Sequence, residues 1–504
     1  MMRKMRNKEA ERAFNRVIRL ARARGKLACR ARYERAIVIS RQREHERAAN
    51  SFKKAIDRCS APDILVRAIY RGAKAFQAAA IYHEAIRLYG LVESDFSSHS
   101  FADDARLHSA RCHLALGERD KFIEMLESLP DAYPAGDMRA EALWAVSHDA
   151  LKRNELRDAR EALERYYTMF PKESGWYASG RSGYWFGRVE ERLGDIESAA
   201  LRYEQVISGS PLTFYMVLAY NRLAAIDHKR ARRLIEELAP RGGKIKARFP
   251  RSLLDDFPGL ATGIELYRLG LLTLARRELD QLLTQPNLPP EVHWLTAAVL
   301  RQAGKFHEAK AAATGAGSGW NGRYPTGRDF VHWSLAYPTA YEDEVNEAAS
   351  QTDVEPAMIW AVMREESSFN PEIESWANAI GLMQLILPTA RSMGKRLGIP
   401  ANRRTLRRPD VNIRLGTAYL ELLRKKFDDH PALMIAGYNA GEGAVGKWAR
   451  ARPGDDIDIF IEDIPYDQTR GYTKRVIATF ATYLFLYGET RSILELDLKL
   501  PAIR

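Results

Sequence analysis

Three consecutive segments of the chain repeat the same order of features, and this repetition limits the possible folds more than any other property of the sequence. Each segment has an apolar helix pattern, a turn residue, and a second pattern rich in Ala, Leu and Tyr that ends at a proline. The segments are residues 105–134, 138–171 and 183–211. Their turn residues are Gly117, Asn154 and Gly194. Apolar residues recur at helical spacing on both sides of each turn, so the segments predict stacked helix pairs.

This arrangement resembles the tetratricopeptide repeats, whose helix pairs stack into a solenoid. Two weaker units, near residues 263–285 and 291–313, continue the pattern. We therefore predict an all-α fold with a tetratricopeptide-like helical superhelix over residues 61–330. The curvature of a solenoid leaves a long concave face, which would suit a protein partner.

The formal net charge of +12 is concentrated at the start of the chain. Residues 1–60 contain 19 Lys and Arg against 6 Asp and Glu, so the remainder is close to neutral. This distribution argues against a protein-wide nucleic-acid surface, and we expect no nucleic-acid partner. We interpret residues 1–60 as a basic helical segment. It is either a solvated helix face, a misassigned start region, or an arm that touches an anionic glycan, lipid or nucleic acid.

Three cysteines lie in the first quarter of the chain, with no CxxC pair and no histidine at metal-ligand spacing. We interpret Cys29, Cys59 and Cys112 as structural, with one disulfide as the alternative. The longest early apolar run, residues 36–39, is too short for a secretory signal. Residues 476–488 suit a core helix better than a membrane span. We expect no transmembrane segment, no metal and no cofactor.

A connector rich in Gly and small residues, 314–328, follows the repeats. Beyond it we predict a second compact helical domain over residues 331–504. Four prolines stand at its expected helix starts or breaks: Pro356, Pro388, Pro409 and Pro465.

The helix that opens at Pro356 carries the first candidate for chemistry. At about 100° per residue, Glu366 projects into the middle of an apolar stripe, Glu365 lies on its flank, and Arg364 points away. The stripe consists of Met358, Ile359, Val362 and Met363. A carboxylate on an apolar face loses hydration, which raises its pKa toward the range of a general acid. This helix alone leaves open a structural role for Glu366, buried or salt-bridged.

Four ordered motifs add to that observation. They are REESSFNPEIESWANAIGLMQLILPTA at 364–390, Asn412-Ile413-x-x-Gly416, AGYNAGEG at 436–443, and IPYDQTRGYTKRV at 464–476. LAYPTAY at 335–341 precedes them. This series resembles the soluble lytic murein transglycosylases, and the helical first half is similar to their superhelical domain. The resemblance implies that residues 331–504 form a lysozyme-like α-helical catalytic domain.

Carried onto this sequence, the resemblance makes Glu366 the sole acid/base. Ser367 and Ser375 would lie near it as hydrogen-bonding support, and Gln384 would line the sugar-binding groove. For Ser367, a helix-end cap is the alternative.

The resemblance also implies that Tyr438 and Asn439 face the substrate and that Tyr472 lies across from Glu366. Ordinary core packing is the alternative for both tyrosines. Three glycines of the same motif would keep its loop close to the glycan because a side chain there would block it: Gly437, Gly441 and Gly443.

Three departures from the family pattern affect the expected substrate preference more than the reaction. Asn378 stands where the family usually has Gly. Ile386 and Leu387 replace a Met-Pro pair, with Pro388 one position later, and Gln468 replaces a common Glu. The change at Ile386 could reshape a sugar subsite.

The implied reaction cleaves the β-1,4 bond between N-acetylmuramic acid and N-acetylglucosamine in peptidoglycan, and it leaves a 1,6-anhydromuramic acid end. Most glycosidases use two carboxylates. Glu372 and Glu374 flank a polar turn and are expected to face solvent, so neither suits the second role. A hydrolytic muramidase and a non-catalytic binding module are the alternatives. The substrate implies a periplasmic or cell-envelope location, although no signal peptide is visible.

Overall fold

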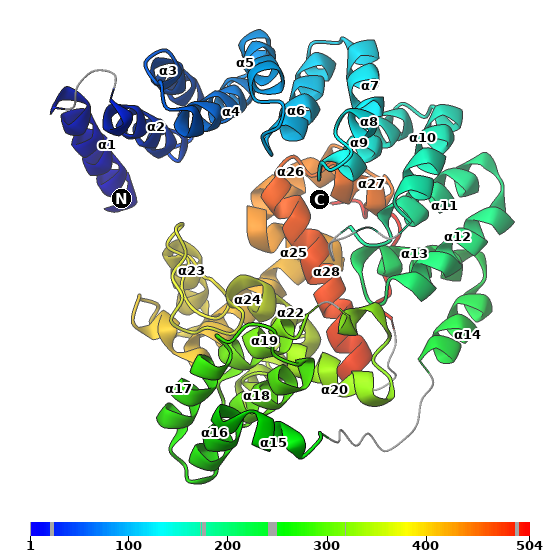
Figure 1. Cartoon of the computed structure of the whole chain (residues 1–504). Helices are drawn as coiled ribbons and strands as arrows, with labels where there is room; N and C mark the ends of the chain where they lie inside the picture. The colour runs from blue at the N-terminus through cyan, green and yellow to red at the C-terminus, as the bar shows by residue number, and fades with distance from the viewer. Residues whose placement is uncertain are drawn as a thin grey trace. The chain divides into compact units, whose positions relative to one another are not determined.

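The chain is all-α, as predicted (Figure 1). The computed structural model describes residues 2–20, 25–171, 173, 178–239, 249–317, 319–488 and 493–503. They fall into two compact units, an N-terminal unit over Met1–Pro171 and a C-terminal unit over Lys172–Arg504. Outside the helices, isolated β-bridges join single residues, and two of them lie within residues 374–385.

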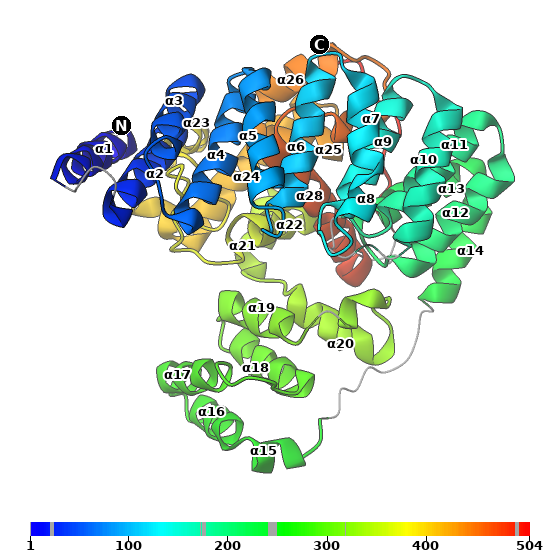
Figure 2. The same ribbon diagram turned by 45° about the horizontal axis from the view of Figure 1, so that its top comes forward.

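The N-terminal unit is a row of helices in which each packs against the next, and Figure 2 shows α2 to α7 side by side. Its helices are α1 (Met2–Leu20), α2 (Lys26–Ser40), α3 (His45–Ile56), α4 (Pro62–Ala78), α5 (Tyr82–Asp95), α6 (Ala102–Ala115), α7 (Arg119–Glu127), α8 (Leu129–Ala132), α9 (Arg139–Lys152) and α10 (Leu156–Met169). Phe52, Phe76 and Tyr89 lie in its core. Fully buried alanines, such as Ala49 and Ala73, let helix backbones approach closely enough to exclude water.

The C-terminal unit begins with further helix pairs and continues into a compact helical bundle. The helices of the first part are α11 (Arg181–Leu193), α12 (Ile196–Gly209), α13 (Phe214–Ile226), α14 (His228–Leu238), α15 (Ser252–Asp256), α16 (Pro258–Arg268), α17 (Leu272–Leu282), α18 (Pro290–Gln302) and α19 (Phe306–Gly315). Those of the bundle are η1 (Trp320–Gly322), α20 (Gly327–Ala336), α21 (Glu342–Ser350), α22 (Pro356–Ser367), α23 (Leu387–Leu397), η2 (Thr405–Arg407), α24 (Pro409–Lys426), α25 (Pro431–Ala440), α26 (Glu442–Arg450), α27 (Ile457–Glu462) and α28 (Asp467–Tyr487).

The turns predicted from the repeats adopt a left-handed backbone. Gly117, Asn154 and Gly194 have φ values of 83°, 60° and 89°, and they separate α6 from α7, α9 from α10, and α11 from α12. A left-handed residue after a helix ends it and reverses the chain. Gly270 and Gly304 do the same between α16 and α17 and between α18 and α19. All five predicted repeat units are therefore helix pairs.

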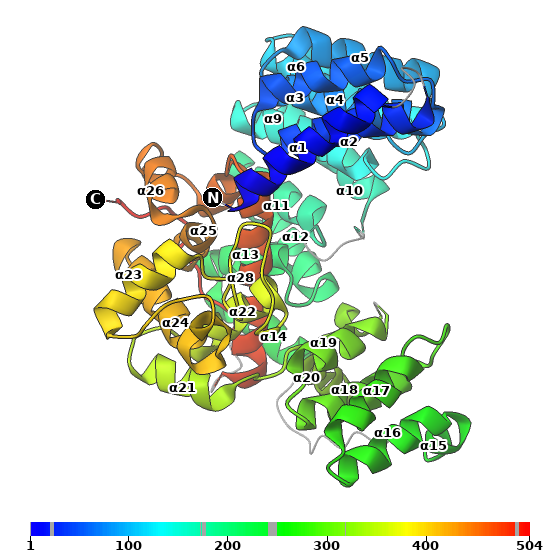
Figure 3. The same cartoon turned by 90° about the vertical axis from the view of Figure 1, so that its left-hand side faces the viewer.

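Helix α28 is the central element of the bundle, where it packs against α13, α20, α22, α25 and α27 (Figures 1 and 3). Two of its buried threonines satisfy their hydroxyls within the helix: Thr473 donates to the Thr469 carbonyl and Thr482 to the Ala478 carbonyl, both at 2.8 Å. The apolar run at residues 476–488 is thus part of a core helix, as expected. None of the described helices combines the length and apolar character needed to cross a membrane.

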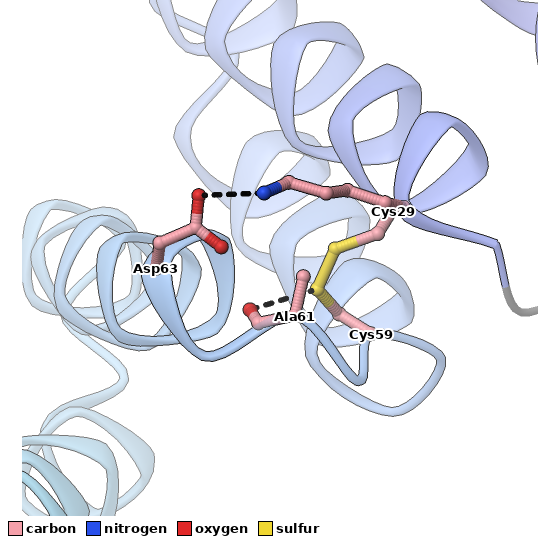
Figure 4. Close-up of a disulfide and its surroundings, with 5 residues drawn as sticks. Cys29, Cys59, Ala61 and Asp63 are labelled. Carbon is pink, nitrogen blue, oxygen red and sulfur yellow. Dashed lines mark hydrogen bonds and ion pairs between the residues drawn. A yellow bond between two sulfur atoms is a disulfide. The ribbon is translucent and has the colours of Figure 1, made fainter.

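Cys29 on α2 and Cys59, which follows α3, form a disulfide that closes 30 residues of chain (Figure 4). The Lys26 ammonium lies 3.6 Å from the Asp63 carboxylate beside it. Cys112 is free and buried. Of the two interpretations of the cysteines, the structure therefore supports the one with a disulfide.

The two compact units divide after Pro171. The three domains expected from the sequence, residues 1–60, 61–330 and 331–504, stay a prediction. α3 packs directly against α4, and α20 runs through residue 330.

Within the C-terminal unit, buried ionic contacts join the helix pairs to the bundle. Asp458 on α27 accepts a 2.5 Å hydrogen bond from Tyr184 and a 2.7 Å bond from Arg188, both on α11. Glu462 accepts from Tyr215 on α13 at 2.6 Å and from Lys474 on α28 at 2.8 Å. The position of α28 therefore depends on residues outside the bundle.

Candidate active site

Helix α22 places Glu366 in its last turn. Pro356 occupies the first turn, where a missing N–H costs no hydrogen bond, as predicted. Every residue from Ala357 to Met363 is buried, so the helix is enclosed on all sides and not only along the predicted stripe. The helix ends at Ser367, because Ser368 turns left-handed. Glu366 is therefore fixed at the end of a rigid, buried element.

Burial dominates the acidity of Glu366. Desolvation raises the pKa of its carboxyl from an ordinary value near 4.5 to about 7. The Tyr472 hydroxyl and the Arg475 guanidinium favour the ionised form and limit the rise, whereas the Glu365 charge adds to it. A carboxyl with this pKa is both a competent proton donor and a competent acceptor near neutral pH.

Two tyrosines from different helices share this environment. Tyr472 on α28 is only 3% exposed, and Tyr438 lies on α25. Burial and the nearby Glu366 charge raise the pKa of both phenols well above the ordinary value, so both remain protonated. The two tyrosines also interact with each other. The structure thus brings together Glu366, Tyr438 and Tyr472.

The two phenol hydroxyls differ in their partners. Tyr438 donates a 2.8 Å hydrogen bond to the Met383 carbonyl, which links α25 to the GLMQ loop. The Tyr472 hydroxyl is buried and interacts with Glu366, but the two groups do not reach full hydrogen-bond geometry. Tyr472 can therefore still donate a hydrogen bond to Glu366 or to a bound group.

Asn439 follows Tyr438 at the end of α25. Its side-chain oxygen accepts a 2.8 Å hydrogen bond from Thr469 on α28. Within the described part of the chain, no group accepts from its amide nitrogen. This contact orients the amide so that its two N–H groups remain available.

The GLMQ loop is held by Asn412 on α24, which is 1% exposed. Its side-chain oxygen accepts from the Met383 N–H at 2.8 Å, and its amide nitrogen donates to the Ile380 and Leu406 carbonyls at 3.0 and 2.8 Å. Gly381 has φ 80°, and an added Cβ would lie 2.3 Å from the Leu406 oxygen. These contacts join two of the sequence motifs in the folded chain.

In three of the predicted substrate-contacting residues, the side-chain polar group is hydrogen-bonded to the backbone. Ser367 donates to the Met363 carbonyl at 3.0 Å, and the Ser375 hydroxyl accepts from the Ala377 and Ala379 N–H groups. The Gln384 amide donates to the Gly381 carbonyl at 2.9 Å and to the Ile373 carbonyl. Among the described residues, neither Ser367 nor Ser375 is hydrogen-bonded to Glu366. Their role beside the substrate stays a prediction.

The interpretation of Gly437 was wrong. An added Cβ there would lie 2.7 Å from the Phe427 ring, so this glycine allows α25 to pack against α24 and the residues that follow it. Nothing lies within 4 Å of the added Cβ at Gly441 or Gly443, and Gly441 has φ 87° at the junction of α25 and α26. By contrast, Asn378 has φ 61°, which Asn tolerates better than other non-glycine residues. The departure from Gly at this position thus keeps a left-handed backbone.

Glu365, the carboxylate next to Glu366 in the sequence, already has partners. Glu365 pairs with Arg364 at 2.7 Å and with Arg475 at 3.4 Å, and it accepts a 2.9 Å hydrogen bond from Thr479. Arg364 also donates to the Ala336 carbonyl and lies over the Tyr337 ring. These contacts of Glu365 and Arg364 were not predicted from the sequence.

Glu372 and Glu374 are exposed, as expected. Glu372 pairs with Arg407, and Glu374 pairs with Arg403 and Arg407. In the same turn, Trp376 is 61% exposed, and Ile386, which directly precedes α23, is 43% exposed. Sequence reasoning did not single out Trp376, although an indole in a polar turn was an available signal.

The LAYPTAY segment connects α20 to α21 and is fastened to α22 and α28. Trp360 donates to the Ala340 carbonyl at 2.9 Å, Tyr483 to the Pro338 carbonyl at 3.0 Å, and Tyr487 to the Tyr337 carbonyl at 2.7 Å.

One group of acids in the N-terminal unit is close enough to share a cation: Asp103, Asp104 and Asp137. Asp103 already accepts from the Met138 N–H and Asp104 from Tyr70. We therefore assign no metal to this group.

Residues 343–461 match the family model described as the transglycosylase SLT domain, so the chain contains this domain. The soluble lytic murein transglycosylase of Salmonella typhimurium is 31% identical over 270 residues, which are 53% of this chain and 39% of that protein. The same-named protein of Escherichia coli K12 is 30% identical over 247 residues, 48% of this chain and 36% of that protein. The aligned part thus spans less than two fifths of these curated relatives.

Solved structures show the same fold. The lytic transglycosylase Slt of Pseudomonas aeruginosa, solved as an inactive mutant, has a TM-score of 0.60 and 21% identity, with 94% of this chain and 76% of that chain covered. The 70 kDa soluble lytic transglycosylase of Escherichia coli has a TM-score of 0.52 and 20% identity, with 98% and 88% covered. The resemblance inferred from the motifs is confirmed, and so is the predicted fold.

Proposed function

We propose that this chain is a peptidoglycan lytic transglycosylase with Glu366 as its sole acid/base. It cleaves the β-1,4 bond between N-acetylmuramic acid and N-acetylglucosamine and forms a 1,6-anhydromuramic acid end. The observation that carries the proposal is a partly buried carboxyl with a pKa of about 7, enclosed by two protonated tyrosines. The SLT domain match supports the substrate class.

One carboxylate is sufficient if the substrate supplies the second reactive group. Glu366 donates its proton to the oxygen that bridges the two sugars, and the bond from that oxygen to C1 of the muramic sugar breaks. The ionised Glu366 then accepts the proton of the 6-hydroxyl of the same sugar, and that oxygen bonds to C1. No water is consumed. Glu365, which pairs with Arg364, and the exposed Glu372 and Glu374 are unsuited to act as a nucleophile on the opposite face.

The groups around Glu366 suit the charge that develops at C1. The free N–H groups of Asn439 and the Tyr472 hydroxyl can bind the N-acetyl carbonyl as its oxygen shares this charge. Tyr438 fixes the GLMQ loop, so that Gln384 can line the groove next to the sugar. Ser367 and Ser375 would shape this groove. Their hydroxyls hold the local backbone, and that backbone would contact the substrate.

A periplasmic or cell-envelope location is part of the proposal. Disulfides persist in oxidising compartments such as the bacterial periplasm, and the Cys29–Cys59 bond suits that environment. The helix pairs would bind a protein partner, as expected for tetratricopeptide-like repeats.

Mass spectrometry of the soluble products tests the reaction. Purified peptidoglycan incubated with the full chain should release muropeptides that lack one water relative to hydrolytic products. Products with reducing ends would instead indicate a hydrolytic muramidase, and no release of soluble products would indicate a binding module.

A further inference from the structure

The turn that follows the helix of Glu366 has an unusual backbone. Ser368 and Phe369, two and three residues after Glu366, have φ values of 49° and 64°. Two consecutive left-handed residues without glycine are strained, and they persist only where surrounding contacts impose them. The Phe369 side chain is 1% exposed, so the core holds the second residue of the turn. Ser368 needs another source of restraint.

Two side chains from α19 supply that restraint. The Lys310 ammonium donates a 2.7 Å hydrogen bond to the Ser368 hydroxyl oxygen. The Nδ1 atom of His307 lies 2.9 Å from the Ser368 carbonyl oxygen, which can only accept, so Nδ1 carries the hydrogen. One residue of the turn is thus held at its side chain and at its backbone by neighbouring positions of one helix.

Helix α19 is itself anchored to the start of the bundle. The Phe306 and Tyr341 rings pack with centroids 5.2 Å apart, and Trp294 on α18 stacks on His332 at 4.4 Å. Arg301 on α18 donates to the Ser334 carbonyl at 3.4 Å. The α18–α19 pair is therefore a firm support for its two contacts with Ser368.

We propose that Lys310 and His307 are positioning residues for Glu366, supplied by a helix pair that lies outside the matched SLT domain. They hold the left-handed turn at Ser368, and this turn fixes where α22 ends and how its last residues point. The amine is desolvated, since burial lowers the pKa of Lys310 to about 8, and Arg364 and Glu365 are the charged groups that act on it. Its contact with Ser368 therefore replaces hydration that the amine has lost.

The first test uses backbone hydrogen exchange, which requires no activity. Lys310→Met removes the donor from the full-length chain, and Lys305→Met is the matched control because Lys305 has no side-chain partner among the described residues. Exchange of the amides in residues 364–372 should become about tenfold faster in Lys310→Met and stay unchanged in the control. Equal exchange in Lys310→Met and the wild type would overturn the proposal.

The second test rests on the proposed function and measures turnover of soluble glycan strands. Lys310→Met and His307→Leu should lower kcat about tenfold with KM within about twofold, since a displaced acid affects chemistry more than binding. His307→Asn should recover most of the activity, because its amide nitrogen can replace Nδ1. Wild-type kcat in both apolar variants would contradict the positioning role.

A double-mutant cycle separates this contact from general destabilisation. Ser368→Ala removes the acceptor of Lys310, so its combination with Lys310→Met should reduce kcat no further than either change alone. Additive losses would refute the coupling. If the wild type releases no product, the proposed function fails, while hydrogen exchange still decides whether the contact restrains the turn.

Discussion

The Tyr472 hydroxyl on α28 interacts with the Glu366 carboxyl at the end of α22 and lowers its pKa, while burial raises it, so that the pKa of Glu366 is about 7. The protonation state of Glu366 is therefore balanced between desolvation, which favours the neutral acid, and two groups that favour the ionised form.

This balance predicts the pH dependence of the reaction. Glu366 must be protonated to act as an acid, so kcat/KM should fall as pH rises through about 7. Tyr472→Phe and Arg475→Met each remove a group that stabilises the carboxylate, and each should move this fall to higher pH. The pH–rate profile of each variant measures the shift. An unchanged or lower midpoint in both variants would contradict the assignment.

The raised pKa also predicts a stability effect. Below pH 4.5 the carboxyl is neutral in the folded and unfolded chains. Between about 4.5 and 7 only the unfolded chain ionises, so wild-type stability falls as pH rises through this range. Glu366→Gln lacks this loss and should be more stable than the wild type by roughly 1–3 kcal/mol at pH 8, with little difference at pH 4.5. Thermal melting at both pH values provides the comparison, and a stabilisation equal at both would disagree with the pKa.

The buried pair of Lys474 and Glu462 should be important for the stability of the C-terminal unit. Lys474→Met removes the ammonium that pairs with the buried Glu462 carboxylate, which should cost about 3–5 kcal/mol. Adding Glu462→Gln removes the charge that has lost this ammonium and should recover part of the loss. Melting temperatures of the single and double variants test the prediction; equal values for the two would show that the lost charge partner is not the cause.

The Cys29–Cys59 disulfide should stabilise the N-terminal unit. A loop of 30 residues corresponds to about 3–4 kcal/mol in the chain-entropy treatment. Cys29→Ala with Cys59→Ala should therefore lower the melting temperature of the N-terminal unit, and reduction of the wild type should have the same effect. Thiol titration under native, non-reducing conditions supplies the control, since two reactive thiols in that unit would mean that the bond does not form.

Local patterns predicted those features that depend on neighbouring residues. The turn glycines and Asn154 mark helix ends through their own backbone conformation, and the place of Glu366 follows from helical periodicity. The partners Tyr438 and Tyr472 came instead from the ordered motifs, because they lie on separate helices that only the fold brings together. Gly437 was misinterpreted for the same reason, since the ring that requires it belongs to Phe427, which follows another helix.

Contacts between residues that lie far apart in the sequence could not be predicted from it. Lys310 resembles any surface lysine in its own helix, and only the folded chain brings it to Ser368. The hydroxyls of Ser367 and Ser375 were assigned to Glu366 from their motif, but nearby backbone groups were available at lower entropic cost.

The most direct measurement of the central claim is the release of anhydromuropeptides by Glu366→Gln, compared with the wild type on the same glycan strands. The variant keeps the shape and hydrogen bonding of the side chain but cannot transfer a proton. Release should fall by at least about a thousandfold, whereas glycan binding should stay within about threefold of the wild type. A variant that releases these products at a rate within tenfold of the wild type would contradict the assignment of Glu366 as the sole acid/base.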